Sequence, residues 1–202
     1  PATEGNPWQD LAARYLRHEF DVLGSGWTRV HYGMTCAGFE GINYSDATVT
    51  AEAVRQQLPR TYLATSQSHS DLAGCLVPGY VPIDWHIDFK SGHRYEVAHH
   101  SKLRYGVLPG VDAKVPADLS RCYHLVPLAL AWRAGGGRRL RDEVVAQLLD
   151  WLAFNPYEHG AAWRANMNVS IRAANWVVAF ALLQDSFQDP DEAERAFLGA
   201  LQ

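Results

Sequence analysis

The spacing of apolar residues divides the chain near Pro116. Beyond this point apolar positions recur every three or four residues, which is the spacing of one helix face. The pattern predicts helices over residues 118–133, 140–154 and 166–183, and the start of a fourth over 190–201. Gly135–Gly137 and Asn155-Pro156 separate the first three. Links this short favour antiparallel neighbours, so residues 117–202 are predicted to form a series of helical hairpins.

The first half of the chain is less regular. Residues 11–23 have helical spacing and end at Gly24, and residues 54–62 are compatible with a short helix. Residues 27–110 show little sustained periodicity, so this segment is expected to wrap a scaffold made by the helices. Irregular segments of this length usually cover a site or another domain. The predicted fold class is mainly α, with a long irregular N-terminal half, in one domain over residues 1–202.

The helix predicted over residues 166–183 carries a polar stripe. It is apolar nearly all round, which is typical of a helix packed on most sides. Asn168, Arg172 and Asn175 lie three and four residues apart and therefore share one side. Polar groups buried without partners are costly. The stripe therefore either forms an internal network or lines a polar cleft, and the sequence leaves both interpretations open.

Two segments near predicted helix ends carry further candidate ligand-binding side chains. Arg121 and His124 lie three residues apart close to a predicted helix N-terminus, where a cation and an imidazole favour a carboxylate or sulfate. The alternative is that Arg121 pairs with Asp118 or Asp112 and that His124 is a core residue. Trp163 precedes the next helix, where it is either a platform for a sugar ring or, as is more common for Trp, a buried anchor.

A third segment, residues 83–90, alternates between apolar and polar positions. The alternation predicts a half-exposed strand with Asp84, His86 and Asp88 on its polar face. Two carboxylates and an imidazole can bind a metal ion. A structural role is favoured, with Trp85 buried and the ions paired. We therefore assign no metal site.

Composition and charge narrow the function classes. The chain has 202 residues, of which 48% are hydrophobic and 20% charged, as in a soluble globular protein. A net charge of −4 gives no field that attracts nucleic acid. There is no leader and no uncharged apolar run of membrane-spanning length. His99-His100 is a bare pair in a polar loop, expected to be solvated. Cys36, Cys75 and Cys122 form no CxxC pair, and nothing indicates a cofactor.

Five short motifs resemble the N-terminal region of heparinase II/III-like proteins, in the order in which that family has them. They cover roughly residues 10–185. They are Phe20–Gly26, Asp84–Gly92, Asp112–Pro116 followed by Leu119–Arg121 and His124, Asp150-Trp151 with Asn155-Pro156, and Ile171–Trp176.

This resemblance implies a fold, an activity and a compartment. The implied fold is an incomplete α/α toroid of helical hairpins, followed in full-length members by a β-sandwich domain. The implied activity is lyase chemistry on uronate-containing polysaccharides such as heparan sulfate or alginate. A polar group neutralises the uronate carboxylate, a Tyr or His removes the C5 proton, and a Tyr protonates the departing oxygen. The implied compartment is periplasmic or extracellular.

The chain also departs from the family pattern. In similar lyases an Asn-His motif follows the helix of the Ile171–Trp176 motif, and the catalytic Tyr and second His lie beyond it. The chain reaches Gln202 without such a motif, so we expect the catalytic set to lie outside it. Its expected role is one wall of a cleft for an anionic polysaccharide, with the β-sandwich domain as a partner. The expected wall residues are Lys114, Arg121, His124, Trp163, Asn168, Arg172 and Asn175. The alternative is a non-catalytic, sugar- or partner-binding helical module of a bacterial exopolysaccharide system; a glycoside hydrolase toroid is a weaker rival.

Overall fold

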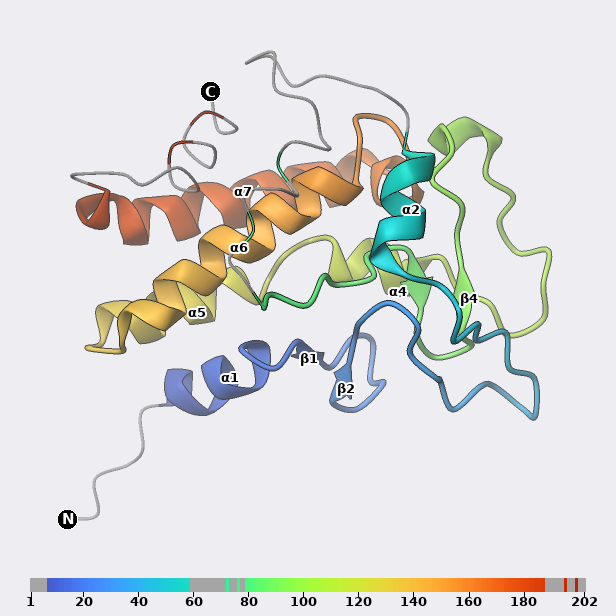
Figure 1. Cartoon of the computed structure of the whole chain (residues 1–202), viewed down its shortest axis with the longest axis horizontal. Coiled ribbons are helices and arrows are strands. Elements are labelled where there is room, and N and C mark those ends of the chain that lie inside the picture. Colours follow the sequence, from blue (N-terminus) through green and yellow to red (C-terminus); the bar gives the residue numbers. More distant parts are fainter. Residues whose placement is uncertain are drawn as a thin grey trace.

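The computed structural model describes residues 7–58, 72, 76, 79–187, 195 and 199, which form a mainly helical fold (Figure 1). The α-helices are α1 (Pro7–Tyr15), α2 (Ala51–Gln57), α4 (Lys114–Leu119), α5 (Leu125–Arg133), α6 (Arg138–Phe154) and α7 (Asn166–Leu183). The short strands are β1 (Glu19–Phe20), β2 (Thr28–Arg29), β3 (Ile87–Asp88) and β4 (His93–Arg94). Single 3-10 turns are η1 (His100–Lys102), η2 (Ala161–Trp163) and η3 (Gln184–Ser186).

Helix α5 lies at the centre of the helical half. It packs against α6, α7 and α1, so that its apolar sequence is covered from several sides (Figure 1). Leu125, Leu128 and Ala129 of α5 are completely buried. Burial of a Leu side chain contributes about 1.5–3 kcal/mol, so these positions contribute substantially to the stability of the helical half.

Helix α6 is the most buried element, with Val144, Leu149 and Trp151 at 1% exposure or less. Its bounds confirm the helix predicted over residues 140–154. Asn155 ends the helix, and its side-chain amide donates to the carbonyl oxygen of Trp151 at 2.8 Å. The irregular segment packs over it: the indole N–H of Trp85 donates to Asp150 at 3.0 Å.

Helix α7 spans Asn166–Leu183, as the apolar periodicity predicted. It is not packed on most sides, however. Met167, Val177 and Val178 are 60%, 65% and 46% exposed. The prediction of burial nearly all round was wrong, because it judged the helix by its hydrophobicity and not by which neighbours lie beside it. The helix expected over residues 190–201 lies almost wholly outside the described residues.

The helix predicted over residues 11–23 is wrong at both ends. Helix α1 begins at Pro7 and ends at Tyr15. His18 adopts a left-handed backbone conformation, with φ of 55°, which stops the helix. Its ring bonds to Glu143 of α6 at 2.7 Å, and Phe20 then pairs with Thr28 in a two-stranded ribbon. Ala12, Phe20 and Val22 of this segment are buried, whereas Leu23 is 49% exposed.

The helix predicted over residues 118–133 is in fact two helices, α4 and α5. Cys122, with φ of 58°, lies in the break between them. Pro127 explains the break, because it lacks an N–H and its ring clashes with the preceding turn of a continuous helix. In the structure it occupies the first turn of α5, where no donor is required.

The irregular segment is more deeply buried than its alternation predicted. Asp84, His86 and Asp88 are at most 1% exposed, so the half-exposed strand was a wrong prediction; strand β3 covers Ile87–Asp88 alone and pairs with β4. The predicted structural role is confirmed: Trp85 is buried and Asp84 forms a salt bridge with Arg94.

Three smaller predictions have mixed outcomes. The helix predicted over residues 54–62 is α2, which begins earlier, at Ala51, because Thr50 caps it by accepting from the amide of Ala53 at 3.2 Å. Cys36 and Cys122 are free thiols, whereas Cys75 lies outside the described residues. Within the described ranges, none of the helices has the length and hydropathy needed to cross a bilayer.

Candidate functional site

The turn between α4 and α5 is the point at which the predicted polar residues meet. The last carbonyl groups of a helix have no partner within it, and those of Ser120 and Arg121 point toward α7. Arg172 donates to the oxygen of Ser120 at 3.3 Å, and the amide of Asn175 donates to the oxygen of Arg121 at 2.8 Å. The polar stripe of α7 therefore donates hydrogen bonds to the carbonyl groups at the C-terminal end of α4.

Arg172 lies in an aromatic enclosure. Its guanidinium carbon is 4.1 Å from the ring centre of Trp151, 4.9 Å from Trp163 and 5.9 Å from Trp176. It also donates to the carbonyl oxygen of Ala162 at 3.4 Å. The side chain is 2% exposed, and this burial lowers its pKa to about 10. It therefore stays positively charged at neutral pH, and the indole faces stabilise that charge.

Arg121 joins the same network from the other side. Its Nε donates to Oδ1 of Asn168 at 2.9 Å, and its terminal nitrogen forms a short ion pair with Asp118. Pairing with Asp118 was one of the two alternatives for this residue. About a fifth of the Arg121 side chain remains exposed. A planar guanidinium with exposed surface can bind a second carboxylate or a sulfate.

His124 is enclosed by aromatic rings. It is 4% exposed and lies 4.8 Å from the ring centre of Phe20, 5.7 Å from Tyr15 and 6.0 Å from Trp85. Burial, together with the nearby His18, lowers its pKa to about 3. The imidazole is therefore neutral at physiological pH and cannot act as a surface cation.

Trp163 and Lys114 border the network. Trp163 is partly buried and contacts both Trp151 and the exposed ring of Tyr157, whose centre is 5.2 Å away. Lys114 is exposed at the first residue of α4. The structure therefore brings Arg121, Asn168, Arg172, Asn175 and Trp163 together around one turn. His124 faces inward and Lys114 lies at the outer end of α4.

The acidic residues of the irregular segment and of α6 have structural partners. Asp88 accepts from the Ser91 hydroxyl at 2.6 Å and from the amide of Asp112 at 2.9 Å. His86 donates to the carbonyl oxygen of Phe154 at 2.8 Å, and burial lowers its pKa to about 3. Burial raises the pKa of Asp150 to about 8, although its Oδ2 accepts hydrogen bonds from Ile83, Trp85 and Tyr80.

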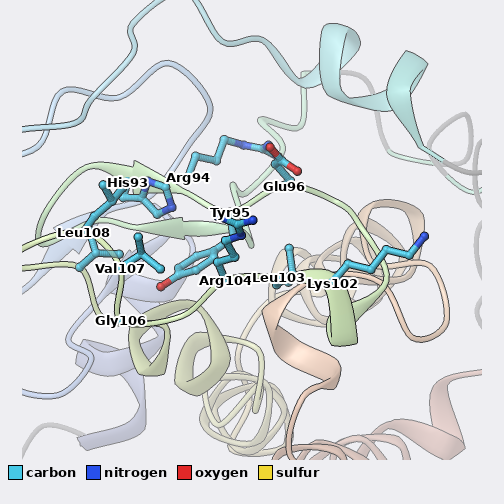
Figure 2. A pocket seen from close by; sticks show the side chains of 11 residues that line it. His93, Arg94, Tyr95, Glu96, Lys102, Leu103, Arg104, Gly106, Val107 and Leu108 are labelled. Atoms are coloured by element: carbon cyan, nitrogen blue, oxygen red, sulfur yellow. The ribbon is translucent and has the colours of Figure 1, made fainter.

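A cavity of about 420 Å³ lies beside β4 and the loop that follows it (Figure 2). It is lined by His93, Arg94, Tyr95, Glu96, Lys102, Leu103, Arg104, Gly106, Val107, Leu108 and Val111. The exposed cations Lys102 and Arg104 suit an anionic ligand, and the volume is within the range of small-molecule sites. No periodic pattern in the sequence points to this site, because most of its residues come from an irregular loop.

A second cavity, of about 520 Å³, lies between the segment after α1 and the start of α6. It is lined by Leu16, Arg17, His18, Arg29, Gly79, Tyr80, Val81, Arg139, Asp142 and Glu143. Its lining carries three arginines and two acidic side chains, so this cavity is of mixed charge. None of the seven predicted wall residues lines either of these two cavities.

The described architecture is that of a mainly helical domain whose hairpins present a polar, Arg- and Trp-containing junction. The chain belongs to the heparinase II/III N-terminus family, whose model matches residues 42–201. The family that the motifs resembled is thereby confirmed. No curated protein and no solved structure matches the chain.

Proposed function

We propose that this domain forms part of the binding cleft for an anionic, uronate-containing polysaccharide that a heparinase II/III-type lyase cleaves by β-elimination. Membership of the heparinase II/III N-terminus family carries this proposal. The hairpins α5, α6 and α7 would be a section of an α/α toroid. The groups that transfer protons during elimination would lie outside residues 1–202.

The geometry supports different roles for the seven predicted wall residues. Lys114, Arg121, Trp163 and Asn175 retain solvent-exposed or partly exposed surface and would contact the polymer. Asn168 and Arg172 are buried and would hold Arg121 and the α4–α5 turn in position. His124 would support the same turn from the inside.

Arg121 is the residue at which binding is best tested. We expect Arg121→Gln to weaken binding to heparin or alginate by about tenfold or more, because one charge-assisted contact contributes roughly 1.5–3 kcal/mol. Isothermal titration of the chain with size-defined oligosaccharides measures this change. The ion pair with Asp118 is partly exposed, so Arg121→Gln is expected to leave the domain folded, which circular dichroism checks.

Arg133→Gln is a matched control. Arg133 is a half-exposed arginine at the opposite end of α5, paired with Asp185. It has the same charge, its side chain is 46% exposed against 21% for Arg121, and it bonds to the last turn of α7, at the Leu182 carbonyl oxygen, rather than to the polar stripe. Equal losses in both variants would indicate unspecific attraction between cations and polymer, and would contradict a cleft at the α4–α5 turn.

Activity is tested by ultraviolet absorbance of the unsaturated uronate that elimination produces. The chain and any longer protein that contains it are incubated with heparin, heparan sulfate, alginate and other polyuronates. Absorbance rising with a longer protein only would support the lyase proposal. Binding without any product would favour the non-catalytic sugar-binding module.

A further inference from the structure

Two loops that are distant in sequence are joined by backbone hydrogen bonds next to η1. The amide of His100 donates to the carbonyl oxygen of Glu158 at 2.8 Å, and that of Gly160 donates to Ala98 at 2.9 Å. His99 and His159 form the corresponding antiparallel bridge. The loop containing residues 98–102 and the loop containing residues 156–160 therefore behave as one unit.

The second loop is fixed against the buried core. Gly160 has φ of 90°, and a Cβ placed there would lie 2.7 Å from the ring of His86. Only glycine fits this position. Glu158 also has a positive φ, of 61°, which non-glycine residues rarely adopt. This backbone conformation directs the Glu158 side chain toward the first loop.

Three metal-binding side chains converge where the loops meet. His99, His100 and Glu158 each present one ligand atom, and these atoms all lie within 4.8 Å of one another. Nε2 of His99 is 3.4 Å from Oε2 of Glu158, and the two histidine rings lie 4.7 Å apart. All three side chains are partly buried. The polar sequence around His99-His100 predicted a solvated pair, and no sequence pattern connected it with Glu158.

The surrounding hydrogen bonds are compatible with coordination. Nδ1 of His99 accepts from the amide N–H of Ser101 at 3.3 Å and lies 2.8 Å from the Ser101 hydroxyl. Metal binding at Nε2 would move the ring proton to Nδ1, which would then donate to the Ser101 hydroxyl in place of the amide contact, the support that metal-bound histidines usually have. His159 lies beside the cluster, with its ring 5.9 Å from that of His99, and its Nδ1 bonds to the carbonyl oxygen of Tyr157.

We propose that His99, His100 and Glu158 form a binding site for a divalent transition metal ion, with Zn²⁺ as the best match. Two imidazoles and one carboxylate are a ligand set that Zn²⁺ accepts, with further positions open to water or to His159. The carboxylate of Glu158 would balance one of the two positive charges of the metal ion. A bound ion links the two loops, and the second of these loops leads into η2 and α7.

The competing description is a simple ion pair between His99 and Glu158. The two side chains are 37% and 45% exposed, and ion pairs of that exposure contribute about 0–1 kcal/mol. An ion pair alone takes up no metal and gives no cobalt spectrum. Metal uptake therefore distinguishes the two descriptions directly.

The test is metal binding to the full 202-residue chain without a histidine tag, after removal of metals by chelation. We expect one equivalent of Zn²⁺ to bind with a Kd in the micromolar range or tighter, and Co²⁺ to give visible absorption bands that Zn²⁺ abolishes. His99→Ala and Glu158→Gln should weaken binding by at least tenfold.

His31→Ala is the matched control, because His31 is another partly buried histidine and its ring bonds to the backbone of Tyr32. The His31→Ala variant should bind Zn²⁺ with the same affinity as the unaltered chain. Circular dichroism confirms that each variant is folded, and Glu158→Gln keeps the size of the side chain. The proposal is overturned if one-site binding is weaker than millimolar, or if His31→Ala lowers affinity as much as His99→Ala.

Discussion

Arg172 is a buried cation that has no salt bridge with any carboxylate in the described part of the chain. Two carbonyl oxygens and three indole faces compensate for its lost hydration. Such an arrangement depends on the planar guanidinium, which can donate within its plane while its faces contact aromatic rings. The residue is therefore expected to contribute to stability before it contributes to any binding event.

We expect Arg172→Gln to lower the free energy of unfolding by about 3 kcal/mol, because it leaves buried acceptors unpaired and removes desolvated cation–π contacts. Arg164→Gln is the control: that guanidinium belongs to an exposed residue and lies 3.8 Å from the ring centre of Tyr105. Its loss should cost about 1 kcal/mol or less. Urea denaturation measures both, and equal costs would contradict the structural role of Arg172.

Helix α7 presents two unlike sides. Asn168, Arg172 and Leu183 face the molecule, whereas Met167 and Val177 are exposed. Two polar residues, Asn168 and Arg172, are thus buried while several apolar ones are not, which departs from the usual amphipathic pattern. The position of each residue on the helix, rather than its hydrophobicity, should determine its contribution to stability.

A pair of substitutions on α7 tests this. Val177→Ser should change the free energy of unfolding by about 0.5 kcal/mol or less, because a side chain that is 65% exposed loses little contact. Leu183→Ala should cost about 2–5 kcal/mol, because the fully buried side chain leaves a cavity. The measurement is the urea midpoint of each variant. A large loss at Val177 would show that the exposed side is covered in solution.

The helices that the sequence predicted well are those with uninterrupted periodicity. The prediction of α6 was right within two residues and that of α7 matched its bounds, because neither contains Gly or Pro. Pro127 indicated the break before α5, but the prediction followed the apolar periodicity and did not take this proline into account. The end of α1 had none, because the left-handed backbone of His18 accompanies a bond to Glu143, which is 125 residues away.

The candidate site was predicted where it depends on helical spacing and was missed where it depends on contacts between loops. Helical spacing placed Asn168, Arg172 and Asn175 on one side, and all three do bond to residues 120–121. Their role in sugar binding stays a prediction. The proximity of His99 and His100 to Glu158 could not be predicted from the sequence, because it depends on a backbone bridge between loops about sixty residues apart. Tertiary proximity of this kind leaves no periodic pattern.

The stability of the whole molecule should depend on pH through three buried groups whose pKa values are shifted by burial. Burial lowers the pKa of His86 and His124 to about 3 from 6.5, and raises that of Asp150 to about 8 from 3.8. Below pH 6.5 the unfolded chain takes up protons at the two histidines, so their contribution to stability is lost as pH falls. Between pH 4 and 8 the folded chain keeps a proton on Asp150, so that contribution is lost as pH rises.

The balance of these opposite slopes predicts a stability maximum near pH 6.5. Each group contributes a slope of up to about 1.4 kcal/mol per pH unit, so two histidines outweigh one aspartate on the acid side. Above pH 6.5, Asp150 is the one group of these three whose proton binding still differs between the folded and the unfolded chain. Urea midpoints measured from pH 5 to pH 8.5 should therefore rise to this maximum and then fall.

Asp150→Asn isolates the alkaline slope, because an amide cannot ionise yet can still accept a hydrogen bond from Ile83, Trp85 or Tyr80. Below pH 6.5 the variant should lose stability more steeply than the unaltered chain, because the opposing slope of Asp150 is absent, and from pH 6.5 to pH 8 it should hold a constant urea midpoint. Asp142→Asn, on the same helix at a position where 37% of the side chain is exposed, should keep the alkaline fall. If the unaltered chain is equally stable at pH 6.5 and pH 8, Asp150 is ionised throughout this range. The three donors to its Oδ2 would then outweigh its burial.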